Sequence, residues 1–243
     1  MTVFFVHGKD SMSKFLNSIA LPLIVALFCV WMITGCSSDE NPVSSGEISG
    51  NLFPLATGRI WVSSAYELDT LGNKIELSTH REALYAHSSL TFQGRNAFLM
   101  IDSVYSTLGS LNFTDTTYMS TDGENFYLYL GQWVPVFKKD EGLNKEYVAG
   151  TFTAELFGVN VDVTVRCKIL PKELVSVPKG TMEAYKLEIK TVVSLVIFSF
   201  EETLNVWFAD GIGPVKFQTP PPIDPFTGQK TNGVESVLVS TNF

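Results

Sequence analysis

The segment VNVDVTVRCKI, from Val159 to Ile169, defines the fold class. Apolar residues recur at every second position, and polar residues occupy the positions between them. A period of two indicates a β-strand with one buried face, because successive side chains of a strand point to opposite sides. A one-residue slip would exchange the two faces, so the register of this strand is tightly specified. Cys167 falls on the apolar face, and we interpret it as a small buried hydrophobe.

Short alternating segments extend from this strand in both directions along the chain. Asp122-Gly123, placed between apolar runs, predicts a hairpin, and Val177 to Thr181 predicts another turn. No long segment repeats with the period of 3.6 that a helix requires. The strands expected from the pattern are 61–68, 74–86, 90–92, 97–105, 113–120, 125–130, 159–169, 185–198, 203–208, 215–218 and 234–241. Strands at hairpin spacing predict a mainly β protein with one antiparallel, strongly curved sheet, a half-barrel or a barrel.

Val192 to Phe198 is apolar on both faces. One interpretation is a strand covered on both sides by other parts of the protein. The other is a strand whose second face lines a cavity for an apolar ligand. Periodicity does not separate these two interpretations.

The N-terminal region has the organisation of an export signal. Lys14 precedes an unbroken apolar run from Ile19 to Met32, and Ile33-Thr34-Gly35-Cys36 follows. The run is shorter than the roughly 20 residues that cross a bilayer as a helix. This pattern resembles a bacterial lipoprotein signal peptide with its lipobox. The resemblance implies cleavage before Cys36 and attachment of acyl chains such as palmitate to that cysteine.

The expected organisation has three parts. Residues 1–35 form the signal peptide, and Met12 is an alternative translation start because Met12-Ser13-Lys14 is an ordinary beginning for such a signal. Residues 36–50 are the lipidated cysteine and a flexible tether rich in Ser, Gly and acidic residues. Residues 51–243 form a single β-rich domain. Ser37 follows the cysteine, and by the sorting rule of enteric lipoproteins this implies the outer membrane.

Charge excludes some classes of partner. The chain has 17 basic and 25 acidic residues, for a net charge of −8. Loss of residues 1–35 removes Lys9, Lys14 and Asp10, which leaves a net charge of about −9. Nucleic acids and anionic lipid headgroups both require basic patches, so we expect no nucleic-acid partner.

Three motifs in the mature chain are similar to those of a loose group of uncharacterised exported bacterial proteins. They are FPLxxGxxW from Phe53, VPxGTxxAY from Val177 and WFAxGIGxVK from Trp207. The resemblance implies a curved sheet with the shape of periplasmic lipoprotein carriers. It implies no activity and no catalytic residues.

The residues give little support for an enzyme. The mature chain has only His80 and His87, and no nucleophile elbow or metal-binding spacing accompanies them. Asp102 shares a strand face with apolar neighbours, and burial would raise its pKa. More often such a residue marks the point where a strand emerges into solvent. We therefore predict no catalytic residue, no metal and no cofactor, and keep a hydrolase as the second alternative function.

The function expected from the sequence is a lipid-anchored, non-enzymatic structural or binding domain of the cell envelope. The first alternative is a carrier or binder of a lipid or other apolar ligand in a concave sheet. The expected partners are the membrane, through lipid on Cys36, and an apolar small molecule or an envelope protein. The residues expected to line an apolar site are Trp61, Tyr127, Tyr129, Trp133, Val196, Phe198 and Trp207.

Overall fold

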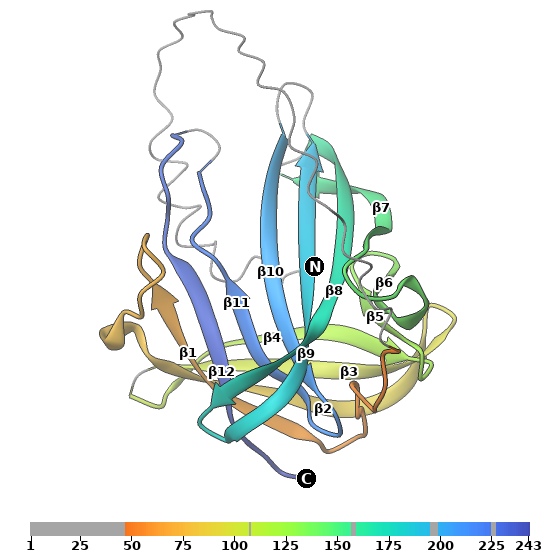
Figure 1. Cartoon of the computed structure of the whole chain (residues 1–243), viewed down its shortest axis with the longest axis horizontal. Helices are drawn as coiled ribbons and strands as arrows, with labels where there is room; N and C mark the ends of the chain where they lie inside the picture. The colour runs from red at the N-terminus through yellow and green to blue at the C-terminus, as the bar shows by residue number, and fades with distance from the viewer. Residues whose placement is uncertain (1–46, 107, 157–158, 195–198, 225–226) are drawn as a thin grey trace, which may run out of the picture.

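The protein forms one twelve-stranded antiparallel sheet (Figure 1). A computed structural model describes residues 47–106, 108–156, 159–194, 199–224 and 227–243. The strands are β1 (Ile60–Leu68), β2 (His80–Phe92), β3 (Arg95–Tyr105), β4 (Leu111–Thr121), β5 (Asn125–Tyr129), β6 (Trp133–Lys138), β7 (Glu146–Leu156), β8 (Val159–Val177), β9 (Gly180–Ser194), β10 (Ser199–Ala209), β11 (Gly213–Thr219) and β12 (Gly233–Thr241). Two 3-10 turns, η1 (Glu76–Ser78) and η2 (Lys139–Glu141), complete the elements. The expected fold class is confirmed.

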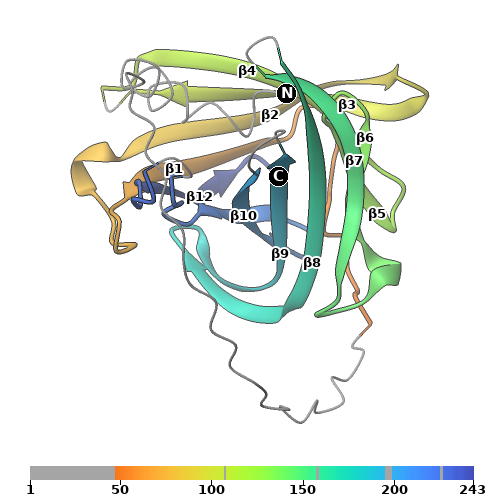
Figure 2. The same ribbon diagram turned by 90° about the horizontal axis from the view of Figure 1, so that it is seen from above.

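Two meanders of six strands make up the sheet. The strand order is β6-β5-β4-β3-β2-β1-β12-β11-β10-β9-β8-β7. Strands β1 to β6 pair in sequence order, as do strands β7 to β12, and the β1–β12 pair joins the two meanders. Viewed from above, the sheet curls around a central space (Figure 2). The first and last strands close the sheet by pairing, from Leu68 opposite Gly233 to Trp61 opposite Thr241. The remaining gap therefore lies in the middle of the sequence, between β6 and β7.

The segments predicted for cleavage and lipidation lie outside the described residues. These are the signal peptide 1–35, the alternative start at Met12 and the lipid site Cys36. The stretch predicted as a tether overlaps the fold at its end, because Ile48 is buried against the core. All twelve strands and both apolar clusters are formed by residues after 46.

The alternating segment lies at the start of β8, where the odd-numbered residues from Val161 to Ile169 are buried. The strand continues to Val177, past the predicted end. A bulge between Leu170 and Lys172 accommodates Pro171, which has no amide hydrogen for the ladder. The bulge explains the missed continuation, because it interrupts the alternation on which the prediction depended.

Other boundaries differ for similar reasons. Segments 74–86 and 90–92 were expected as separate strands, but β2 runs continuously from His80 to Phe92 with a bulge at His87. Strands β6 and β7 were not predicted. Strand β6 contains Pro135 and buries consecutive residues, Val136 and Phe137, while β7 is interrupted by a bulge before Gly150. Neither strand shows a sustained period of two.

Side chains bridge the gap between β6 and β7. The hydroxyl of Tyr147 donates to the carbonyl of Val136 at 2.9 Å and accepts from the amide of Lys138 at 3.2 Å. Further along, the amide group of Gln132 donates to the carbonyl of Thr151 at 3.2 Å. The curled sheet is thus held together at this gap by side chains instead of a backbone ladder.

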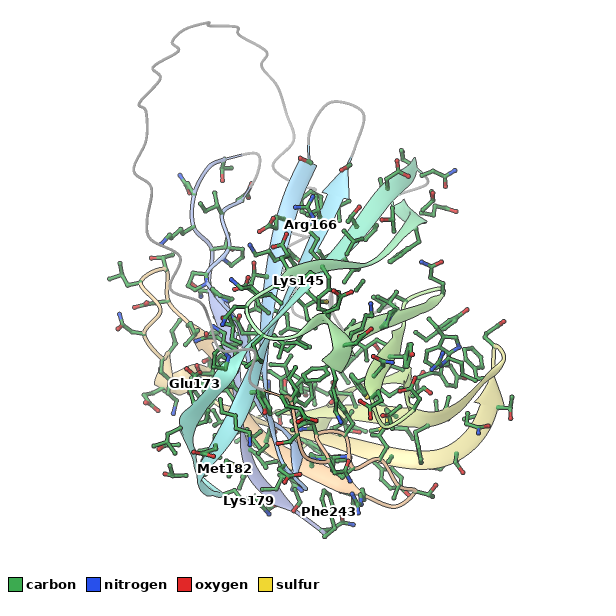
Figure 3. The ribbon with its side chains drawn as sticks, turned by 45° about the vertical axis from the view of Figure 1, so that its right-hand side comes forward. Lys145, Arg166, Glu173, Lys179, Met182 and Phe243 are labelled. Atoms are coloured by element: carbon green, nitrogen blue, oxygen red, sulfur yellow. The ribbon has the colours of Figure 1, made fainter. Side chains whose placement is uncertain are left out.

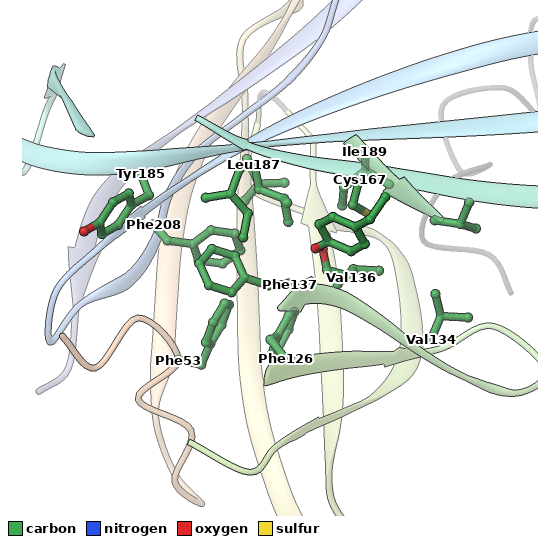
Figure 4. Packing of buried hydrophobic residues seen from close by; sticks show 14 of the residues in the cluster. Phe53, Phe126, Val134, Val136, Phe137, Cys167, Tyr185, Leu187, Ile189 and Phe208 are labelled. Atoms are coloured by element: carbon green, nitrogen blue, oxygen red, sulfur yellow. The ribbon is translucent and has the colours of Figure 1, made fainter. Parts of the chain in front are cut away.

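The larger apolar cluster lies on the inner face of the sheet (Figure 4). Phe53 stacks on Phe126 with ring centroids 4.3 Å apart, and it also contacts the rings of Phe137 and Phe208. Aromatic pairs in these arrangements add stability beyond the area they bury. Phe53 precedes β1, so a residue outside the sheet completes the core.

A second cluster includes residues of the opposite face. Trp207 alternates with Phe208 on β10, so its ring lies on the outer face. There it contacts the ammonium groups of Lys186 and Lys216, and its indole nitrogen donates to Glu173. The tip of the β8–β9 hairpin reaches β12, where the amide of Lys179 donates to the carbonyl of Leu238. The long hairpin, on which Figure 3 labels Glu173, Lys179 and Met182, therefore folds over this part of the outer face.

Candidate functional site

The two ends of the curled sheet differ. The connections that follow even-numbered strands lie at one end of the sheet, which we call the closed end. The connections that follow odd-numbered strands lie at the opposite end, which we call the open end. Antiparallel pairing throughout the sheet requires this separation. In Figure 1 the β1–β2 connection lies at the left and the β11–β12 connection above it, whereas the N-terminal segment in orange lies at the lower right.

Residues 47–59 cover the closed end. The amide of Gly211 donates to the carbonyl of Asn51 at 2.9 Å, and the amide of Ser49 donates to the hydroxyl of Tyr185 at 3.3 Å. The indole nitrogen of Trp61 donates to the carbonyl of Ile212 at 2.7 Å. With Phe53 inserted among the inner aromatic rings, this end holds a filled core.

Inner side chains toward the open end are only partly buried. Phe152, Phe200, Leu204 and Phe217 share the inner face with the main core, because each lies opposite an inward residue of a neighbouring strand. All four pack against the larger cluster and retain some exposure. The inner face thus continues beyond the filled core as accessible apolar surface.

Carboxylates share this inner surface. Asp102 lies directly opposite Asp115 on β4, and Glu82 of β2 lies two pairs further along, opposite Val104. Glu202 projects inward from β10 opposite Thr191. Five basic residues of β8 to β11 occupy the outer face by the same alternation; they are Arg166, Lys168, Lys186, Lys190 and Lys216. Lys172 differs, because it lies opposite inward Tyr185 and its ammonium group is 5.1 Å from the centroid of that ring.

Burial changes the protonation of these carboxyl groups. Burial, with the nearby charges of Glu82 and Asp115, raises the pKa of Asp102 to about 7. Burial also raises the pKa of Glu202 above its ordinary range. The expectation that a buried Asp102 would have a raised pKa agrees with this result. These carboxyl groups favour a neutral or positively charged group in the open half over an anion.

His80 also faces inward, beside Glu82. Its Nε2 lies 3.4 Å from a carboxylate oxygen of Glu82, whose other oxygen accepts from the hydroxyl of Ser236 at 2.9 Å. The hydrogen bond between His80 and Glu82 is the largest cause of the raised pKa of His80. The carboxylate therefore stands between the hydroxyl and the imidazole, an order that does not activate the serine as a nucleophile. His87 is exposed at the β2 bulge.

The aromatic residues predicted to line one site do not converge on one surface. Trp61 is inward and buried at the closed end, whereas Trp207 lies on the outer face under the β8–β9 hairpin. By alternation with Phe126 and Val134, Tyr127, Tyr129 and Trp133 also point outward. Val196 and Phe198 lie outside the described residues.

Tyr129 and Trp133 belong to an aromatic cluster on the outer face. Phe92 stacks on Tyr118 at 3.7 Å between centroids, and Tyr129 meets both rings edge to face. The indole nitrogen of Trp133 is 3.2 Å from the carbonyl of Phe92. These contacts join the β2–β3 hairpin to β5 and β6, which gives the cluster a structural role.

The inner residues of the open half were not singled out from the sequence. Phe152 and Phe200 lie in segments without sustained alternation, and Glu202 is adjacent to a second glutamate, so the sequence does not indicate which of the two faces inward. Their convergence depends on strand pairing, in which Thr191 lies opposite Glu202 and Val163 opposite Phe152. A pairing scheme for β7 to β10 would have been the signal that finds them.

Across the part of the chain that the structure describes, no group of three or more His, Cys, Asp or Glu side chains is arranged to hold a metal ion. None of the helical segments there is long and apolar enough to cross a membrane. Cys167, predicted as a buried hydrophobe, is almost fully buried, and burial raises the pKa of its thiol.

The fold and inner surface define a single-sheet β protein that is filled at one end and carries apolar and acidic side chains at the other. No family model matches the chain, and no curated protein matches it. A solved structure of a candidate lipoprotein from Parabacteroides distasonis ATCC 8503 is similar, with 12% identity, a TM-score of 0.48, and coverage of 79% of this chain and 99% of the other. A candidate exported protein with a YmcC-like fold from Bacteroides fragilis NCTC 9343 has 13% identity, a TM-score of 0.46, and coverage of 80% and 100%.

Proposed function

We propose that the protein is a lipid-anchored, non-enzymatic binding domain of the bacterial envelope, with the outer membrane as its site of attachment. The lipobox ending at Cys36 supports the anchor. Attachment of two or three acyl chains holds a protein on a bilayer almost permanently, because each buried methylene contributes roughly 0.8 kcal/mol. The arrangement of Ser236, Glu82 and His80 supports a role other than hydrolysis.

The inner surface of the open half is the proposed binding site. One observation carries this proposal: the apolar inner face continues past the filled core as partly exposed side chains, including Phe152 and Leu204. Ligand sites of this kind combine apolar walls with a few polar groups. Asp102 and Glu202 supply polar groups whose charge disfavours an anionic head. The proposed ligand is an amphiphile with an apolar chain and a neutral or cationic head.

Native mass spectrometry tests the proposal. The mature chain from Ser37, exported to a bacterial periplasm and purified without detergent, is expected to carry an apolar adduct that denaturation removes. Phe152→Gln places an amide on the inner face and is expected to reduce adduct occupancy several-fold. Thr153→Gln, on the outer face of the same strand, is the matched control. Thermal melting verifies that both variants fold.

An adduct-free mass, together with no uptake of added dodecylamine, would contradict the binding proposal. Equal occupancy in the two variants would also contradict this location for the site. The anchor is tested separately by metabolic labelling with a clickable palmitate analogue. Labelling is expected in the full chain and absent in Cys36→Ser.

A further inference from the structure

Exposed aliphatic side chains are concentrated at the open end. The three most exposed are Leu77 and Leu108, both 94% exposed, and Leu71, 85% exposed. Isolated apolar side chains on a surface are ordinary, so their number alone proves nothing. Their distribution is unusual because these three leucines lie in two separate connections at the same end of the sheet. Leu111, Val159 and Ile223 are also exposed and lie in or beside connections at that end.

Hydrogen bonds fix the loops that carry these leucines. In the β1–β2 connection, one carboxylate oxygen of Asp69 accepts from the amides of Leu71 and Asn73 at 2.9 and 2.8 Å. In the β3–β4 connection, the hydroxyl of Ser106 accepts from the amide of Ser110 at 3.1 Å, and the two backbones pair at 2.7 Å. The leucines are therefore presented in defined positions, and their insertion would require little ordering of the backbone.

The pattern fits a lipid surface better than a protein surface. Binding at a bilayer surface scales with the apolar area that enters the headgroup boundary, so separate loops can each contribute a side chain. In the β1–β2 connection Lys74 pairs with Glu76 at 3.0 Å, and Asp69 leaves this connection with a net charge of −1. The chain as a whole is acidic, so electrostatic attraction to anionic lipids does not supply the binding. These observations favour a zwitterionic bilayer.

We propose that the open-end rim, defined as Leu71, Leu77, Leu108, Leu111 and Ile223, inserts into the headgroup boundary of a zwitterionic lipid bilayer. The proposal does not require a ligand inside the sheet. The carbonyl of Glu47 accepts from the hydroxyl of Tyr185 at 3.5 Å, so a tether from Cys36 would join the fold at the closed end, opposite the rim. The rim proposal therefore stands without that anchor.

Vesicle flotation tests the rim apart from the lipid anchor. The mature chain from Ser37, which lacks Cys36, is mixed with vesicles of equal parts phosphatidylcholine and phosphatidylethanolamine. We expect the chain to float with them, with little change when salt is raised. The triple variant Leu71→Ser, Leu77→Ser and Leu108→Ser should bind at least tenfold more weakly, because each leucine loses its apolar transfer free energy. The control is Val148→Ser with Leu174→Ser, exposed positions away from the rim.

Site-specific fluorescence gives an independent result. A polarity-sensitive dye on Leu108→Cys should shift to shorter wavelength with vesicles, while the same dye on Leu174→Cys should not. Buried Cys167 is protected from the label in both. No flotation of the unlipidated chain, equal losses in the triple variant and its control, or equal dye shifts would overturn the proposal. A dimer in solution that is lost in the triple variant but kept in its control would also overturn the proposal. That result would mean that the rim binds a second copy of the chain.

Discussion

The closed and open ends of the sheet use the same strands for different purposes. At the closed end, Phe53 fills the space between inward aromatic residues, and residues 47–59 cover them. At the open end, apolar side chains remain partly exposed beside Asp102, a carboxyl group with a raised pKa. Stability is therefore concentrated at one end, and the other end retains polar groups that are costly to bury. Such a division is typical of proteins whose binding site is held by a rigid scaffold.

The largest effect is expected from emptying the closed end. Phe53→Ala removes a buried ring that contacts three others, so the free energy of unfolding should fall by about 3–5 kcal/mol. Urea unfolding measures the change. Leu77→Ala at the open end is the control, and its effect should be within about 0.5 kcal/mol because the side chain is almost fully exposed. Equal losses of unfolding free energy in the two variants would show that the closed end is packed no better than the open end.

Asp102→Asn should reveal the cost of a carboxyl group in the open half. The pKa of Asp102 is about 7 in the folded state, against an ordinary value of 3.8. Between these values the unfolded chain releases a proton that the folded protein retains, so the wild type loses stability as pH rises from about 4 to about 7. The full shift corresponds to at most about 4 kcal/mol.

Urea unfolding of both proteins at pH 4 and pH 8 measures this difference. Asp102→Asn should be similar to the wild type at pH 4 and more stable at pH 8. Asp162→Asn, on the exposed outer face of β8, is the control and should change little between the two values. A wild type that gains stability over this range relative to Asp102→Asn would show that the sign is wrong.

Alanine substitutions at one glycine of each end compare how well the two ends tolerate an added methyl group. Gly213 at the closed end and Gly72 at the open end both have a φ near +89°, which favours glycine. A Cβ on Gly213 would lie 3.2 Å from Pro54 and 3.3 Å from the indole nitrogen of Trp61, whereas a Cβ on Gly72 meets no atom within 4 Å. Gly72→Ala should cost about 1 kcal/mol. Gly213→Ala should cost about 2 kcal/mol, because packing adds to the strain. Thermal melting of both variants measures the difference, and equal shifts would show that the closed end accommodates the methyl group.

The smallest effect on stability is expected at the gap between β6 and β7. This gap runs along the sheet from the closed end to the open end. Tyr147→Phe removes a buried hydroxyl that serves both a carbonyl and an amide of β6, and should cost about 1–1.5 kcal/mol. Hydrogen exchange at Lys138 should accelerate. Tyr127→Phe, whose hydroxyl bonds the exposed Asp122, provides the control and should have little effect. Unchanged exchange at Lys138 would mean that the hydroxyl does not hold the gap closed.

The fold class could be predicted because alternation in residues 159–169 and the turn at Asp122-Gly123 follow from local chemistry. The site could not be predicted to the same extent. The face on which Trp207 or Tyr127 lies depends on register, and the pairing shifts beside both residues, between Trp207 and Phe208 and between Phe126 and Tyr127. The role of Phe53 depends on a contact between a segment before β1 and rings from β5, β6 and β10.

Hydrogen exchange with and without an amphiphile tests the difference between the two ends most directly. Dodecylamine and dodecanoate have the same apolar chain and opposite head charges. We expect the amine to slow exchange around Phe152, Thr191 and Leu204 in the open half and to leave Leu187 and Phe53 unchanged. Dodecanoate should be much less effective. Protection at the closed end, equal protection by the two compounds or no protection at all would contradict this expectation.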